Sequence, residues 1–414
     1  MIMNPFDQKP ADVNKFMDWK TIYPKPYDKN ATNPYSKIRT ILMNGTEFEQ
    51  VWFLHQFYRH ETNNDIRRQI ALVRRQEQQQ QKRIACLKPL DETILENTIG
   101  YEQLAVDLTA ELAQREKNMY VKQALDFALL EDFDHLYRYA DLLEMDKGIL
   151  AENLVGRYTE IMPGRPTISE HRHPYDDVKR FTNYKVSDPI TKLNIGIITA
   201  AEQQTMNYYM NVCGFYYNDI GRKLYQEIGL IEEQHVTLYG GLMDTTCTWL
   251  EAWLEHEYTE CYLYYSCYVN ETDKMLKKIY KEHFEQELAH LHLVAGLLQK
   301  YENKHRSQVI TNGEFPQLLV LKPNIEYVRN VLKNTVTLTG YREEYKDVAD
   351  LPEDAEFFNF QKQVNDKLGD IASHKTIHDY IKKKGTDYRF QDAPHPVPQL
   401  ANRKVDNTTV GRQA

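Results

Sequence analysis

Apolar residues recur with the period of an α-helix over most of the chain from residue 46 to residue 302. Proline and glycine are sparse in this region, and its periodic stretches are long. The pattern predicts an all-α fold, with one main helical domain that contains three helical hairpins. We place these hairpins at residues 91–143, 190–243 and 245–301.

The regions on either side of this domain lack the helical period. Residues 1–45 are rich in Pro, Asn, Lys and Tyr, which predicts an extended arm lying on the core or on a partner. Residues 303–414 are mixed, and we expect short helices near 354–383 and a mobile polar tail after residue 390. Inside the helical domain, residues 145–189 predict a loop-rich crossover.

One helix of this domain is strongly polar. The stretch IRRQIALVRRQEQQQQKRIACL has the length and period of a long helix. We expect its Gln and Arg side chains to form a solvated face.

The stretch GLIEEQHVTLYGGL places an acid and a histidine on a helix face that is otherwise apolar. Glu232 and His235 are three residues apart, so they share one face with Tyr239. The same spacing leaves the adjacent Glu233 for solvent. A further acid, Glu202, stands thirty residues before Glu232. The pattern is therefore an acid followed thirty residues later by acid-x-x-His.

This template occurs three times in the chain. The three copies are Glu102, Asp132 and His135; Glu202, Glu232 and His235; and Glu257, Glu287 and His290. The midpoint of each copy falls in a polar turn sequence with Asn or Asp available to cap the next helix. Each copy therefore predicts a helical hairpin in which both acids and the histidine lie level, about 22 Å from the turn.

Several carboxylates inside a helical core are costly unless something compensates their charge. A pair of divalent metal ions removes that cost. Two hairpins together supply four carboxylates and two imidazoles, which is the ligand set of di-iron and di-manganese four-helix bundles. Because oxygen ligands with imidazoles suit these metals, we expect two iron ions, with manganese as the alternative.

The helical region resembles the ferritin-like superfamily of carboxylate-bridged di-metal proteins over about residues 90–300. Glu260, one turn after Glu257, makes the third hairpin similar to rubrerythrin, in which an extra carboxylate joins the site. The resemblance implies an oxidoreductase that reacts with dioxygen or peroxide, of the ferroxidase, peroxidase or oxygenase type. A rubredoxin-type cysteine domain is absent, so an external molecule would donate the electrons.

The template alone leaves open which two hairpins share a site. We favour the second and third hairpins, because both have the complete glutamate set. The alternative pairs the first and second hairpins, since the 66 residues between His135 and Glu202 can supply the long crossover that ferritin-like folds usually have. In the first hairpin Asp132 is a short ligand, and Glu131 could substitute for it.

Three other features have less specific interpretations. The crossover contains His171, His173 and Asp176, which we interpret as an incidental polar loop, with a third metal site as the alternative. His283, one turn before Glu287, is a core histidine or a group behind a ligand. The tyrosines on the helices of the first acids, Tyr209 and Tyr264 among them, are expected mainly to pack in the core.

Composition narrows the classes of function. The net charge of −9 argues against nucleic acid as the main partner, and no stretch is apolar enough for a membrane helix. The N-terminus lacks the apolar core of a signal peptide, and the five cysteines are scattered, which favours a cytoplasmic protein with reduced thiols. We expect a homo-oligomer. The alternative function is a non-catalytic helical scaffold in which the polar residues pair with each other.

Overall fold

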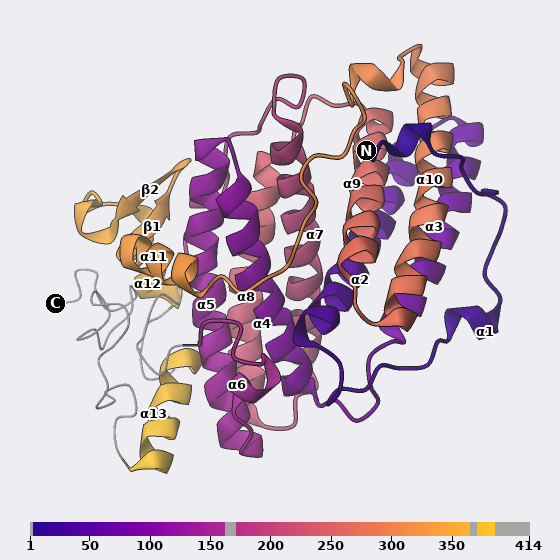
Figure 1. The fold of residues 1–414 in the computed structure, drawn as a ribbon. Helices are drawn as coiled ribbons and strands as arrows, with labels where there is room; N and C mark the ends of the chain where they lie inside the picture. Colours follow the sequence, from indigo (N-terminus) through magenta and orange to yellow (C-terminus); the bar gives the residue numbers. More distant parts are fainter. Residues whose placement is uncertain (1–2, 162–170, 365–370, 386–414) are drawn as a thin grey trace. The chain divides into compact units, whose positions relative to one another are not determined.

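The computed structural model describes residues 3–161, 171–364 and 371–385. Within these ranges the protein is all-α, apart from one two-stranded β-hairpin, as the sequence predicts (Figure 1). The chain divides into two compact units. Unit 1 comprises residues 1–92, 181–201 and 243–321, and unit 2 comprises residues 93–180, 202–242 and 322–414.

Four long helices dominate unit 1 and lie side by side, although two precede and two follow the long helices of unit 2 in the sequence (Figure 1). They are α2 (Pro34–His60), α3 (Asn64–Ala85), α9 (Trp249–Asn270) and α10 (Lys274–Glu302). The side chain of Asp273 caps α10, and Thr248 forms a capping box with Glu251 at the start of α9. The unit also contains η1 (Pro5–Asp7), α1 (Trp19–Ile22), η3 (Arg306–Gln308) and the first half of α7 (Pro189–Val212).

Unit 2 is built on α4 (Ile94–Arg115), α5 (Met119–Lys147), the second half of α7, and α8 (Asp219–Leu242). Thr93 and Glu96 form a capping box that starts α4, and the left-handed Gly148 ends α5. The short crossover elements are α6 (Ala151–Leu154) and η2 (Pro174–Asp176). The predicted turns between the helices of all three hairpins are confirmed.

The residues after 321 add small elements to unit 2. They are α11 (Ile325–Thr335), β1 (Leu338–Tyr341), β2 (Glu344–Asp347), η4 (Val348–Asp350), α12 (Glu356–Val364) and α13 (Ala372–Lys384). The two strands are antiparallel, with Leu338 opposite Asp347. The Tyr327 hydroxyl donates to Asp126 at 2.6 Å, and Tyr380 donates to Glu144, so α11 and α13 are held on α5. The predicted tail after residue 390 lies outside the described residues.

The N-terminal arm is shorter than predicted, because Asn33 caps a helix that already begins at Pro34. The arm before α2 lies against the other parts of unit 1. The backbone N–H of Met17 donates to Gln79 at 2.8 Å, and that of Phe315 donates to the carbonyl of Met3 at 2.8 Å.

The solvated-face prediction for α3 is wrong on one side of the helix. Gln76, Glu77 and Gln80 are all buried there. This buried side of α3 belongs to a bundle in which the third predicted hairpin, α9–α10, packs with α2 and α3. Across the described ranges, none of the helices combines the length and the apolar character that crossing a membrane requires.

Candidate metal centres

Unit 2 brings the first and second templates together in its core. Glu102, Asp132, His135, Glu202, Glu232 and His235 are each at most 1% exposed. We call these six residues the unit 2 cluster. Their ligand atoms form two groups, and the atoms of each group lie within 4.8 Å of one another. One group consists of Asp132, Glu202, Glu232 and His235, and the other of Glu102, His135 and Glu232. Glu232 belongs to both groups, so it lies between two potential ion positions.

The two imidazoles of this cluster direct their Nδ1 atoms toward its carboxylates. His135 Nδ1 lies 2.8 Å from Glu232 Oε1. His235 Nδ1 lies 3.3 Å from Glu232 Oε2 and 3.4 Å from Asp132 Oδ1. Among the described residues, neither oxygen of Glu202 has a hydrogen-bond partner, and its Oε2 lies 3.7 Å from His235 Nδ1. Glu202 is thus a buried carboxylate that only this longer ion-pair contact with His235 is seen to offset.

Residues behind the unit 2 cluster fix its orientation. His235 Nε2 lies 3.0 Å from Glu131 Oε2, so Glu131 supports the histidine and is not a substitute for Asp132. Arg172 makes an ion pair with Glu131 and donates to Asp177 at 2.8 Å. The Tyr209 hydroxyl donates to Glu102. Nothing in the sequence pattern pointed to Arg172, because it is in the crossover, away from the template.

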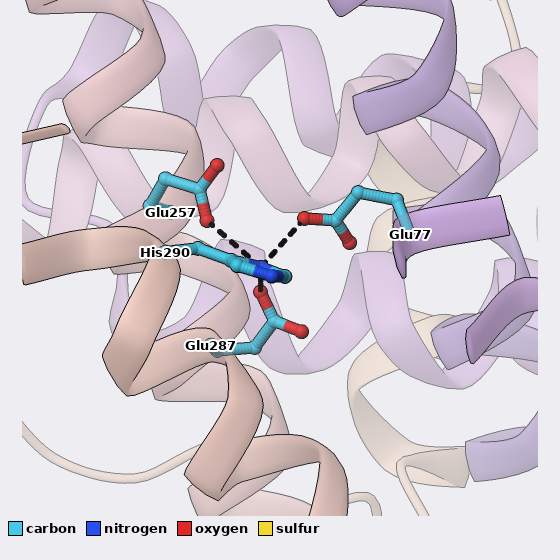
Figure 2. A group of neighbouring side chains, drawn as sticks. All are labelled: Glu77, Glu257, Glu287 and His290. Atoms are coloured by element: carbon cyan, nitrogen blue, oxygen red, sulfur yellow. Dashed lines mark hydrogen bonds and ion pairs between the residues drawn. The ribbon is translucent and has the colours of Figure 1, made fainter. Parts of the chain in front are cut away.

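Unit 1 holds a second group of the same kind. Glu77, Glu257, Glu287 and His290 have ligand atoms within 4.8 Å of one another, and Figure 2 shows the three carboxylates turned toward the imidazole. His290 Nδ1 lies 2.8 Å from Glu77, 3.1 Å from Glu287 and 3.7 Å from Glu257. A neighbouring group consists of Glu47, Glu77 and Glu260.

We call Glu47, Glu77, Glu257, Glu260, Glu287 and His290 the unit 1 cluster. All six side chains are at most 2% exposed. Glu77 belongs to both groups, as Glu232 does in unit 2. Each unit therefore presents two adjacent ligand groups joined by one shared glutamate.

The α2–α3 hairpin is a fourth copy of the template that the sequence search missed. Glu47 stands thirty residues before Glu77, and Gln80 follows three later. Because Gln80 replaces the histidine, the acid-x-x-His search passes over this copy. The thirty-residue spacing with glutamine allowed in the last position would have found it.

The four copies also agree outside the template. His290 Nε2 lies 2.8 Å from Gln76, the residue before Glu77, just as His235 Nε2 contacts the residue before Asp132. The Tyr264 hydroxyl donates to Glu47, as Tyr209 donates to Glu102. Each tyrosine is seven residues after the first acid of its own hairpin. The two units therefore share one plan of ligands and supporting residues.

The predicted pairing of the second and third hairpins is wrong. Glu202, Glu232 and His235 form their groups with Glu102, Asp132 and His135 of the first hairpin. Glu257, Glu260, Glu287 and His290 form theirs with the α2–α3 hairpin. Asp132, despite its shorter side chain, reaches the ligand group.

The other interpretations from the sequence have mixed outcomes. Glu233 is exposed, as predicted, and accepts from Thr237 at 2.9 Å. His283 Nδ1 lies 2.9 Å from the Tyr264 hydroxyl, which places it behind Glu47. In the described part of the crossover, His171, His173 and Asp176 do not form a ligand group with one another.

Burial raises the pKa of several carboxylates in both clusters. Burial and the charge of Glu77 raise the pKa of Glu287 to about 7. Burial also raises the pKa of Asp132 to about 7 and that of Glu260 well above its usual range. Glu232 is the exception: burial opposes its ionisation, but His135 and His235 together hold its pKa below the usual range.

No family model matches the chain, and no curated protein or solved structure matches it.

Proposed function

We propose that the protein is a di-metal oxidoreductase of the ferritin-like class, with its reactive centre in the unit 2 cluster. The observation that supports this most directly is the pair of ligand groups sharing Glu232. Each group contains one histidine and at least two carboxylates, which is the ligand composition of di-iron and di-manganese bundles.

The residues present fit two divalent ions. Buried polar atoms normally have partners, and those left without one need an explanation. In the unit 2 cluster, both oxygens of Glu202, Oε2 of Glu102 and Oδ1 of Asp132 are buried and have no hydrogen-bond partner in the described part of the chain. The four carboxylates of this cluster would balance the charge of two divalent ions.

The protein side chains would hold and orient the ions. Glu131, backed by Arg172, would accept the Nε2 proton of His235 and leave Nδ1 free as the ligand atom. Tyr209 would hold one oxygen of Glu102 by its hydroxyl. Bound iron or manganese would supply redox chemistry with dioxygen or peroxide, with electrons from an external donor.

Metal analysis combined with spectroscopy tests this proposal. Protein loaded with Fe²⁺ in air should show the near-ultraviolet absorption of an oxo-bridged di-ferric centre, and it should consume dioxygen or peroxide. Glu232→Ala should lower both the iron content and the absorption. Glu233→Ala is the matched control, because its side chain is exposed on the same helix.

Two results would favour the scaffold alternative instead. One is a loaded protein that shows neither the absorption nor any oxidant consumption. The other is a Glu232→Ala variant that keeps the wild-type iron content. In that case the role of the cluster would be structural, through the ion pairs of His135 with Glu232 and of His235 with Glu131.

A further inference from the structure

The two ligand groups of unit 1 differ in their chemistry. The group of Glu77, Glu257 and Glu287 contains His290. The group of Glu47, Glu77 and Glu260 contains only carboxylates, because Gln80 stands where the other three hairpins have a histidine. In unit 2, by contrast, both ligand groups include an imidazole.

The all-carboxylate group contains buried oxygens without hydrogen bonds. Glu260 is 2% exposed, and neither of its oxygens has a hydrogen-bond partner among the described residues. The same is true of both oxygens of Glu77. A buried carboxylate with both oxygens unpaired is costly in a helical core. An ion at this position would remove that cost.

Two other carboxylates of the unit 1 cluster, Glu47 and Glu257, accept hydrogen bonds from neutral donors. Gln50 donates to Glu257 at 2.6 Å, and Trp253 donates to the same oxygen at 2.5 Å. Tyr264 donates to Glu47. Within the described ranges, the other oxygens of the two glutamates have no hydrogen bond. The supporting residues thus orient the carboxylates without neutralising them.

We propose that unit 1 is a second metal centre with two unlike positions: a mixed position at Glu77, Glu257, Glu287 and His290, and an all-oxygen position at Glu47, Glu77 and Glu260. Carboxylate oxygens suit hard divalent cations such as Mn²⁺ and Mg²⁺, whereas imidazole suits iron, zinc, copper and nickel. The all-oxygen position therefore selects a hard cation.

Two cavities of unit 1 are lined by residues of the two positions. A cavity of about 180 Å³ is bordered by Thr46, Gln50 and Glu260, on the side of the all-oxygen position. A larger cavity of about 500 Å³ lies under the N-terminal arm and reaches Gln76 and His290, on the side of the mixed position. A proposed metal site needs such a path for the ion.

Metal counting in a chain that lacks two ligands of the unit 2 cluster tests the proposal. The background variant is full-length Glu232→Ala/His235→Ala, exchanged with equal Fe²⁺ and Mn²⁺ and checked for folding by circular dichroism. It should retain both metals, and bound Mn²⁺ should give an electron paramagnetic resonance signal. Adding Glu260→Gln should remove about one ion per chain, mainly Mn²⁺.

Glu255→Gln is the matched control in that background. Glu255 is buried on the same helix and borders the same cavity, but it is paired with Lys192 at 2.6 Å. This variant should keep the metal content of the background. A background that folds but binds neither metal would overturn the proposal, as would equal metal loss in the two glutamine variants. If the background does not fold, Glu260→Gln and Glu255→Gln are compared in the wild-type chain. There too, Glu260→Gln should bind about one ion fewer than Glu255→Gln.

Gln80→His tests the all-oxygen assignment from the opposite direction. An imidazole at residue 80 would give unit 1 the histidine pattern of unit 2. The ratio of bound iron to bound manganese should then rise in the Glu232→Ala/His235→Ala background. An unchanged ratio would contradict the selection of a hard cation. Because every variant in this series starts from the Glu232→Ala/His235→Ala background, a difference in metal content between variants reports on unit 1, and the outcome is distinguishable from failure of the unit 2 proposal.

Discussion

At the scale of single residues, the two units differ most clearly behind their histidines. His235 contacts the carboxylate Glu131, whereas His290 contacts the neutral amide Gln76. A carboxylate partner makes an imidazole a more basic ligand than an amide partner does. The charge of Glu131 is itself stabilised, because Arg172 counteracts its burial and helps to lower its pKa.

Glu131→Gln should therefore weaken metal binding in unit 2 alone. The change gives His235 the same kind of partner that His290 already has. We expect a loss of affinity of about 10–100-fold at the unit 2 positions, measured by equilibrium dialysis with Fe²⁺ and elemental analysis. Unit 1 in the same protein is the internal control. Equal weakening of both units, or no weakening, would contradict this role for Glu131.

At the scale of elements, the helical hairpin is the repeated unit, and caps define its turns. The side chain of Asp273 accepts from the backbone N–H groups of Met275 at 2.8 Å and Leu276 at 3.0 Å, which starts α10. Glu287 and His290 lie more than three turns further along this helix. A loss at the cap should thus affect stability more than the ligands.

Asp273→Ala should destabilise the protein by about 1 kcal/mol, because two N–H groups lose their acceptor. Asp273→Asn, which retains an accepting oxygen, should lose only a fraction of this. Denaturant melts of both variants measure the difference. Their metal content should match that of the wild type, and a large metal loss in Asp273→Ala would show that the cap positions the ligands.

The hairpins themselves could be predicted from the sequence, but their partners could not. The thirty-residue spacing determines the level of the ligands within one hairpin, because helix rise is constant. The spacing is the same in all four copies. It therefore does not show whether the hairpin of Glu202 pairs with that of Glu102 or with that of Glu257. The fourth copy was missed for a chemical reason, the substitution of histidine by Gln80. Arg172 was missed because a loop residue has no periodic signal.

At the scale of the whole molecule, both clusters make the stability of the metal-free chain depend on pH. Burial raises the pKa of Glu287 from 4.5 and that of Asp132 from 3.8, each to about 7. Between these values the folded chain holds protons that the unfolded chain has released, so stability falls as pH rises. The pKa of His290 is raised, chiefly by Glu77 against the effect of burial, and acts in the same direction. The lowered pKa values of Glu131 and Glu232 act below this window.

Metal-free protein should therefore be more stable at pH 5.5 than at pH 8, by about 1–3 kcal/mol. Ions bound to the ionised carboxylates should reverse this trend, because they replace the protons and bind only the folded chain. Thermal melts with chelator and with added Mn²⁺ at both pH values measure the effect. A metal-free protein that is more stable at pH 8 would contradict the cost assigned to the buried carboxylates.

The order of the four hairpins along the chain has a consequence for folding. In unit 2 the paired hairpins are neighbours, and His135 meets Glu232 across 97 residues. In unit 1 they are the first and the last, and Gln50 meets Glu257 across 207 residues. Doubling a loop adds only about 0.6 kcal/mol of closure entropy, but distant contacts form later. The α4–α5 and α7–α8 hairpins of unit 2 should thus pair while α2 and α3 still await α9 and α10, which are synthesised after them.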